Sequence, residues 1–363
     1  MFVLHLALLS CAVTALANPP HLTPITGPFK TGVVNLPLTD YSRKDLFAPN
    51  NFRKLMVSIY YPTPEHNNNP TSYITPAVAS IYEAQLNLTS GSLTTVVANS
   101  KKNALPLLVP NSKRVIFSHG GGTSRLIHTA LLEDLASYGY VAISIDHPYD
   151  ANAVQFPDGS VILRDPSNFT TDLLDRWYRQ RLDDIYFVDG LTGDFSIICP
   201  TVQARTAALV AGHSFGGAAV AGAMIESHRF IGGFNFDGAF WNNSIAGDAV
   251  KPFFIMGGSV RIPAGDTSWD TFRAAQTGWN REAIVSGIQH FGFTDFPSLI
   301  QALGVPRTQG ILDFIGTIAP DRAIQIQRTY VKDFADWRFG KGPGRIVAGP
   351  TPQFPEVSFV PPP

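Results

Sequence analysis

A single serine between glycines, in the segment VAGHSFGGAAVAG at residues 210–222, constrains the fold more than any other feature of the sequence. Gly212, Ser214 and Gly216 form the pattern G-x-S-x-G, the nucleophile elbow, in which a strand turns sharply into a helix and exposes the serine hydroxyl. Glycine is needed on both sides because larger side chains would collide with neighbouring backbone. An apolar run precedes Ser214 and an Ala/Gly-rich segment follows it, as an elbow requires.

Short apolar runs alternate with helical patterns from about residue 54 onward, which is typical of a mostly parallel sheet with helices on both faces. Strands are expected at residues 55–61, 114–120, 140–146, 207–213, 229–237, 251–258 and 282–290. Helices are expected at residues 125–138, 172–190, 215–228 and 321–338. Together with the elbow, this order predicts an α/β-hydrolase fold with an insertion before the strand at 114–120.

The pattern predicts one α/β-hydrolase domain over residues 18–340, with two segments of different composition. Residues 62–112 are rich in Pro, Asn, Ser and Thr and contain one helical patch, so a cap-like insertion is expected there rather than a unit of the sheet. Residues 341–363 contain too much proline for regular structure, and a tail wrapped over the surface or disordered is expected.

Composition excludes several classes of partner. With 45% hydrophobic residues in a chain of 363, a large core can form, and the net charge of −1 comes without any Lys/Arg run. A nucleic acid or acidic polymer is therefore not expected as partner.

The glycine-rich turn at 120–122 lacks the lysine of a P-loop, the pattern GxGxxG is absent, and the histidines show no metal-ligand spacing. No cofactor and no metal are predicted.

Residues 1–17 are predicted to be a secretory signal peptide. An apolar run precedes Ala15-Leu16-Ala17, the small-x-small pattern of a cleavage site, which predicts cleavage before Asn18 and a secreted, extracellular protein. The run is too short to span a bilayer. A buried apolar strand is the alternative for this segment.

Cysteine and glycosylation patterns fit the same compartment. Cleavage would remove Cys11 and leave Cys199 as the only cysteine, so no intramolecular disulfide is expected. Asn87, Asn168 and Asn242 each begin an N-glycosylation sequon, as in a secreted glycoprotein.

The chain order identifies a base for Ser214. A serine hydroxyl becomes a good nucleophile when a base takes its proton and a third group holds that base in one tautomer. In this fold the order is serine, acid, histidine. Of the two histidines after Ser214, His228 closes the helix that follows the elbow, at the opposite end of the sheet. His290 follows the last predicted strand and can return to the carboxyl ends, so His290 is predicted as the base.

Two places offer the acid. Asp237 ends the strand after the elbow helix, beside Gly238, and the strand end would place its carboxylate rigidly. Asp266 and Asp270 follow the next strand in a polar loop, where many hydrolases of this fold carry their acid. Asp237 is favoured, the later pair stays open, and a turn-forming role would also account for Asp237.

An acyl-transfer site also needs donors aimed at the oxyanion of the tetrahedral intermediate. The backbone N–H of Phe215, the residue after the nucleophile, is the first predicted donor. The second is expected from the turn after the strand at 114–120, where Gly120, Gly121 and Gly122 allow close approach to a substrate. Gly121 is favoured, with Gly120 next.

These motifs, in this order, resemble the secreted, calcium-independent platelet-activating-factor acetylhydrolases. The resemblance runs through GPFKTGV (27–33), SIYYP (58–62), VIFSHG (115–120), YRQRLDD (178–184), GHSFGG (212–217), FNFDGAFW (234–241) and QHFGFTDF (289–296). It implies a triad of Ser214, Asp237 and His290, with oxyanion amides from Gly121 and Phe215. Vertebrate members carry a larger apolar residue where Gly121 stands, which bears on the pocket rim and so on the substrate.

The resemblance further implies a cofactor-free serine esterase that removes short or oxidised sn-2 acyl groups from phospholipids such as platelet-activating factor. Peripheral contact with lipid surfaces is compatible with such a substrate, and no protein partner is predicted. Two other functions stay open: a secreted carboxylesterase acting on phenolic esters or polyesters, and a non-catalytic α/β-hydrolase binding module.

Overall fold

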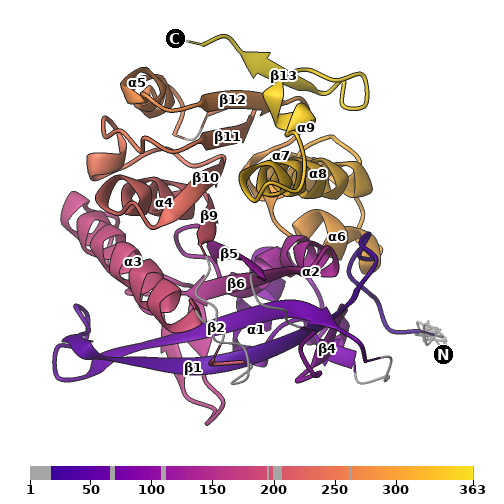
Figure 1. Ribbon diagram of the computed structural model, residues 1–363. Coiled ribbons are helices and arrows are strands. Elements are labelled where there is room, and N and C mark those ends of the chain that lie inside the picture. The colour runs from indigo at the N-terminus through magenta and orange to yellow at the C-terminus, as the bar shows by residue number, and fades with distance from the viewer. Residues whose placement is uncertain are drawn as a thin grey trace, which may run out of the picture.

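The computed structural model describes residues 18–65, 70–107, 112–193, 196–198, 207–261 and 263–362. The predicted signal peptide, residues 1–17, and Cys199 lie outside these described residues. Within them, eleven strands form one sheet, and helices cover both of its faces (Figure 1). None of the described helices is both long enough and apolar enough to cross a membrane.

The sheet is parallel in its centre and antiparallel towards its edges. Its strands, in spatial order, are β13 (Val357–Val360), β12 (Asn280–Val285), β11 (Phe253–Gly258), β10 (Phe230–Phe236), β9 (Ala208–His213), β5 (Lys113–Ser118), β6 (Tyr140–Asp146), β2 (Phe52–Thr63), β1 (Lys30–Lys44), β4 (Val97–Lys102) and β3 (Pro70–Ser72). Strands β12 to β6 in this order run parallel, whereas β13 and β2 are antiparallel to their neighbours. The carboxyl ends of the parallel strands therefore meet at one edge, where ligands bind in such sheets.

Two helical layers enclose the sheet. The helices are α1 (Pro76–Gln85), α2 (Thr129–Ser137), α3 (Thr171–Thr192), α4 (Phe215–Glu226), α5 (Ser268–Ala275), α6 (Phe296–Ala302), α7 (Gln309–Ile315), α8 (Pro320–Arg338) and α9 (Arg345–Ala348), with 3-10 turns η1 (Leu93–Thr95), η2 (Arg125–His128), η3 (Asn242–Ser244) and η4 (His290–Phe293). Helices α3, α4 and α5 share one apolar core with the sheet, and α2 and α8 share another on the opposite face (Figure 1). A small hairpin of β7 (Ala153–Gln155) and β8 (Val161–Leu163) lies outside the main sheet.

Residue choice explains the central layer. All seven residues of β6 are buried, as expected for a strand covered on both faces. Seven of the twelve residues of helix α4 are glycine or alanine, and this lets the helix approach its neighbours closely. A Cβ added at Gly217 would lie 1.8 Å from Asn235 Oδ1 of β10, and one at Gly222 would lie 1.9 Å from the Tyr178 hydroxyl of α3. Glycine is therefore required at both contacts.

Several elements differ from the sequence expectation. The segment 62–112, expected to be an insertion outside the sheet, contributes β3 and β4 to it, and β4 pairs in parallel with β1. The expectation of a tail without regular structure was wrong, because β13 pairs antiparallel with β12 and α9 precedes it. Strand β12 ends at Val285 rather than at 290, and the helix expected at 125–138 begins as the 3-10 turn η2. Strand β1 was not predicted.

One side chain of α8 contacts the N-terminal segment of the described chain. Arg328 of α8 donates to the backbone oxygens of Pro24, at 2.7 Å, and of Thr23, at 3.0 Å. The same guanidinium donates to the backbone oxygen of Ala130 in α2. The side chain is 5% exposed, so these charge-assisted hydrogen bonds are shielded from water.

Candidate active site

Ser214 stands in the turn between β9 and α4. Its backbone adopts φ 55° and ψ −127°, the strained conformation of a nucleophile elbow. A Cβ at Gly212 would lie 2.4 Å from the backbone of Gly216, and one at Gly216 would lie 2.1 Å from the backbone oxygen of Ser118. The two glycines of the motif are thus required by backbone packing, and the predicted elbow has its expected shape.

Asp237 and His290 come together although 53 residues separate them. Asp237 follows β10 and His290 begins η4, so each stands just beyond a strand end. His290 Nδ1 lies 2.7 Å from Asp237 Oδ2, and Asp237 Oδ1 accepts from the Gly258 N–H at 2.8 Å. A carboxylate on Nδ1 keeps the proton there and leaves Nε2 unprotonated, which is the tautomer of a general base.

The turn that carries Asp237 packs against Ser214. A Cβ at Gly238 would lie 2.0 Å from the Ser214 backbone oxygen, so the two turns are in contact. Ser214 N–H also donates to the Phe236 oxygen at 2.8 Å. Within the described part of the chain, the Ser214 hydroxyl has no hydrogen bond to His290. Catalytic contacts are often long in a free enzyme and tighten with substrate, so this geometry is compatible with a triad.

The alternative acids lie elsewhere. Asp266 accepts from the N–H and hydroxyl of Ser268, and Asp270 forms an exposed ion pair with Arg261 at 2.8 Å. Neither carboxylate contacts His290. The geometry therefore favours Asp237 over the later pair.

Two residues that support this arrangement were not assigned that role from the sequence. Asn235 donates to the Gly238 oxygen at 2.7 Å and accepts from the Gly238 N–H at 3.0 Å, which clamps the turn after Asp237. His213 Nε2 donates to the backbone oxygen of His290 at 3.0 Å. Burial holds the pKa of His213 well below its usual range, so a neutral ring makes this contact. Asn235 lies only two residues before Asp237 in FNFD, but that spacing does not reveal the clamp.

The oxyanion loop lies directly against the elbow. A Cβ at Gly120 would lie 3.2 Å from Ser214 Cβ, and one at Gly121 would lie 3.6 Å from Phe215 Cβ. The N–H of Phe215 belongs to the first turn of α4, where backbone donors lack intrahelical partners. The N–H of Gly121 makes no hydrogen bond with another described residue, whereas that of Gly122 donates to the Asp150 oxygen at 3.1 Å. The two predicted oxyanion donors are therefore neighbours and both available.

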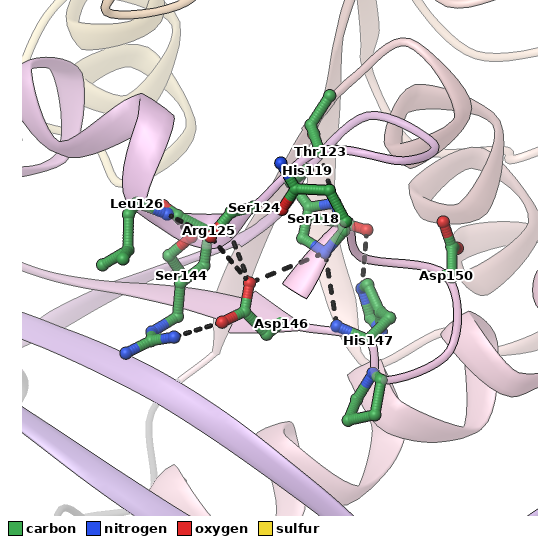
Figure 2. A network of polar contacts seen from close by, with 12 residues as sticks. Ser118, His119, Thr123, Ser124, Arg125, Leu126, Ser144, Asp146, His147 and Asp150 are labelled. Atoms are coloured by element: carbon green, nitrogen blue, oxygen red, sulfur yellow. Dashed lines mark hydrogen bonds and ion pairs between the residues drawn. The ribbon is translucent and has the colours of Figure 1, made fainter. Parts of the chain in front are cut away.

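A buried polar network lies beneath this loop (Figure 2). Asp146, at the end of β6, forms an ion pair with Arg125 and accepts from its N–H at 2.7 Å. The His147 N–H donates to His119 Nε2 at 3.2 Å, and His147 Nε2 lies 2.9 Å from the Ser118 hydroxyl. Burial lowers the pKa of both histidines, so the rings are neutral members of the network.

Asp184 of α3 completes this network from below. It lies 2.8 Å from His147 Nδ1 and forms an ion pair with Arg53 at 2.7 Å. Burial alone would raise the pKa of Asp184, but Arg53, the hydrogen bond from His147 and Arg43 hold it far below the usual range. The carboxylate is therefore charged, and it fixes the orientation of the imidazole above it.

A cavity of about 430 Å³ lies between β1, β2, the segment after β3 and the start of α2. Its walls include Tyr60, Tyr73, Arg125, Leu126 and Phe156. None of the five predicted site residues lines it. We therefore place the chemistry at the elbow, where the proposed reacting groups converge, and not in this cavity.

The parallel sheet, the elbow and the Asp237–His290 pair define an α/β hydrolase. Residues 16–156 match the family model described as platelet-activating factor acetylhydrolase, isoform II. The chain is 32% identical to a protein of Arthroderma benhamiae named "Probable 1-alkyl-2-acetylglycerophosphocholine esterase", over 92% of each chain. It is 26% identical to the platelet-activating factor acetylhydrolase of Cavia porcellus, over 74% of this chain and 68% of that one.

A solved structure gives the same fold. The ferulic acid esterase from Streptomyces cinnamoneus superposes with a TM-score of 0.81 and 30% identity, over 94% of this chain and all of that one. The chain belongs to the platelet-activating-factor acetylhydrolase family and is a carboxylic ester hydrolase. The predicted fold and the predicted family are both confirmed.

Proposed function

We propose that this chain is a secreted serine esterase that removes the short or oxidised sn-2 acyl group of platelet-activating-factor-like phospholipids. The observation that carries the mechanism is the contact of His290 Nδ1 with Asp237 Oδ2, at 2.7 Å, beside the Ser214 elbow. The names of the two relatives support the substrate class, since both refer to hydrolysis of a 2-acetyl glycerophospholipid.

The proposed reaction is acyl transfer to water. Ser214 Oγ attacks the ester carbonyl carbon while His290 Nε2 takes the hydroxyl proton. The π electron pair of the carbonyl moves to its oxygen. This oxyanion accepts hydrogen bonds from the N–H groups of Gly121 and Phe215. The ester C–O bond then breaks, and His290 protonates the leaving alcohol. Water attacks the acyl-enzyme with His290 again as base, which releases the acid and restores Ser214.

The test is a substrate panel with purified protein and the Ser214→Ala variant. We expect kcat/KM to be highest for an sn-2 acetyl phospholipid and to fall for its long-chain counterpart. Ser214→Ala should lose about 10⁴-fold or more in kcat and should no longer be labelled by a fluorophosphonate probe. Retained activity in that variant would overturn the mechanism. An unlabelled, inactive wild-type protein would favour the non-catalytic binding module.

A second function has an observation of its own in the structural likeness to a ferulic acid esterase. Gly121 also leaves the rim beside Phe215 open, because no side chain projects from it. An esterase acting on phenolic esters would use the same three residues. Turnover of methyl ferulate with a kcat/KM above that of the acetyl phospholipid would select this second function.

Secretion and glycosylation are proposed on two features. The predicted leader ends before Asn18, and the sequon residues Asn87, Asn168 and Asn242 are all exposed. Expression in a eukaryotic host should yield protein in the medium that begins at Asn18 and loses mass on endoglycosidase treatment. Intact protein starting at Met1 and retained in the cells would contradict the proposal.

A further inference from the structure

Arg181 of α3 reaches the oxyanion loop from below. Its guanidinium is fully buried and forms an ion pair through Nε with Asp150. Nη1 donates to the Ser118 hydroxyl at 2.9 Å and to the backbone oxygen of His119 at 2.5 Å. Nη2 donates to the backbone oxygen of Gly120 at 3.2 Å. One side chain therefore binds two consecutive carbonyl groups of the loop.

These contacts determine where the loop N–H groups point. In a trans peptide the C=O and the following N–H point in opposite directions. Because Arg181 holds the Gly120 oxygen on the α3 side, the N–H of Gly121 is directed to the other side. This N–H is the proposed oxyanion donor, and a Cβ at Gly121 would lie 3.6 Å from Phe215 Cβ. Three successive glycines have little intrinsic preference for one backbone conformation. Hydrogen bonds to the Gly120 oxygen therefore select it, from Arg181 and, within the loop, from the Thr123 hydroxyl and the His119 ring.

The same guanidinium also contacts the other half of the oxyanion hole. Its central carbon lies 5.3 Å from the ring centroid of Phe215, within the range of a cation–π contact. Asp150, the ion-pair partner, accepts from the Gly122 N–H through its backbone oxygen at 3.1 Å and its carboxylate at 3.2 Å. The Arg181–Asp150 pair thus forms hydrogen bonds with the residues on both sides of Gly121: Arg181 with Gly120, and Asp150 with Gly122.

We propose that Arg181, held by Asp150, is a positioning residue that orients the Gly121 and Phe215 amides towards the oxyanion. This inference rests on the proposed Ser214 mechanism. The charge of Arg181 is compensated by Asp150, so its effect comes from the orientation of the loop rather than from a long-range field. Thr123 shares the task in part, since its hydroxyl donates to the Gly120 oxygen at 2.9 Å.

Arg181→Lys tests the inference. Lysine keeps the charge and the ion pair, but a single ammonium cannot bind two carbonyls and a ring face with a planar fork. We expect kcat to fall about 10- to 100-fold, less than the 10²–10³-fold typical of deleting an oxyanion donor. KM should stay within about twofold, because the ground-state carbonyl depends little on the oxyanion donors. The affinity for a tetrahedral boronic acid analogue should fall by the same factor as kcat.

Arg328→Lys is the matched control. Arg328 is also buried and also donates to backbone oxygens, but those belong to residues 23, 24 and 130, outside the loop. It should lose thermal stability to a similar degree while keeping kcat and analogue affinity. If Arg181→Lys does not fold, Asp150→Asn replaces it, because the amide oxygen can still accept from Gly122 N–H while the ion pair and the acceptor for Arg181 Nε are lost. Its expected losses in kcat and analogue affinity have the same sign and are smaller.

The outcomes separate the two proposals. If Arg181→Lys, or Asp150→Asn in its place, keeps kcat and analogue affinity within about twofold of the wild type, the positioning role is refuted. A loss of kcat without weaker analogue binding also refutes it. In both cases fluorophosphonate labelling of Ser214 in the wild type would leave the proposed mechanism standing. Absence of labelling in the wild type would instead remove the mechanism itself.

Discussion

An Asp237→Asn substitution preserves the shape of the proposed triad and removes one acceptor. Asp237 accepts two N–H groups, from Gly258 at Oδ1 and from His290 Nδ1 at Oδ2, with distances of 2.8 and 2.7 Å. Its side chain is 1% exposed, so water cannot replace a lost partner. An Asn side chain offers one acceptor and one donor group, and it cannot accept both bonds.

The two orientations of the amide have different consequences. With its oxygen towards Gly258, the NH₂ faces Nδ1, and the imidazole must carry its proton on Nε2, where it cannot take one from Ser214. With its oxygen towards His290, the useful tautomer survives, but the NH₂ opposes the Gly258 N–H. Two buried donors are then unpaired, at about 1–3 kcal/mol each. The productive orientation is therefore disfavoured by about 2–6 kcal/mol, or about 30-fold to 10⁴-fold.

Loss of the negative charge opposite the imidazolium adds to this penalty. We therefore expect kcat to fall by about 10³–10⁴-fold, as for the same change in a serine protease triad. The assay is hydrolysis of p-nitrophenyl acetate across neutral and mildly alkaline pH, with the melting temperature measured in parallel. Asp266→Asn, at the rival acid, is the matched control and should keep full activity. A kcat for Asp237→Asn within tenfold of the wild type would refute the tautomer argument.

Three further predictions concern stability. Gly217→Ala would bring a Cβ to 1.8 Å from Asn235 Oδ1. It should lower both the melting temperature and kcat, because it disturbs the Asn235 clamp. An unchanged melting temperature would contradict the close contact between α4 and Asn235. Burial raises the pKa of Asp295 to about 8, so the folded state holds a proton that the unfolded state loses above pH of about 4. The contribution of this group to the free energy of unfolding should decline as pH rises from about 4 to 8. Urea titrations at several pH values should show a smaller decline for Asp295→Asn. The same dependence of the unfolding free energy on pH in the variant and the wild type would argue against a protonated carboxyl. Truncation before residue 357 removes β13 and exposes the edge of β12. This should lower the melting temperature and promote self-association, seen by size-exclusion chromatography. A truncated protein that stays monomeric with an unchanged melting temperature would show that β13 does not protect this edge.

The parallel centre of the sheet could be predicted because its strands are buried on both faces and therefore nearly continuous in apolar residues. The predicted strand 140–146 matches β6 residue for residue, and the predicted strand 207–213 matches β9 to within one residue. The edges gave less signal. Strand β1 mixes polar and apolar residues over its fifteen positions, and β13 is flanked by prolines that usually indicate a loop. The pairing of β13 with β12 is a tertiary contact that no local sequence pattern encodes.

The site shows the same division. Motif order was enough to propose Asp237 and His290, whose contact the structure contains. The contacts that hold them could not be read from spacing. Asn235 clamps a turn only three residues away, but the pattern does not reveal that bond, and His213 binds a residue 77 positions away in another element. Arg181 lies in the conspicuous segment YRQRLDD, yet its partner carbonyl at Gly120 is 61 residues away. Sequence patterns identify residues whose side chains can take part in catalysis. Only the packing of the folded chain reveals the buried hydrogen bonds that orient them.

The hydrogen bonds of Arg328 with the backbone at residues 23 and 24 bridge more than 300 positions of the chain. During synthesis the early segment must therefore wait for α8 before this contact can form. Contacts of such long sequence separation slow folding, and the nascent protein would leave apolar surface of α2 uncovered until late. An enzyme built in this way completes the packing around its N-terminal segment only after α8 has been made.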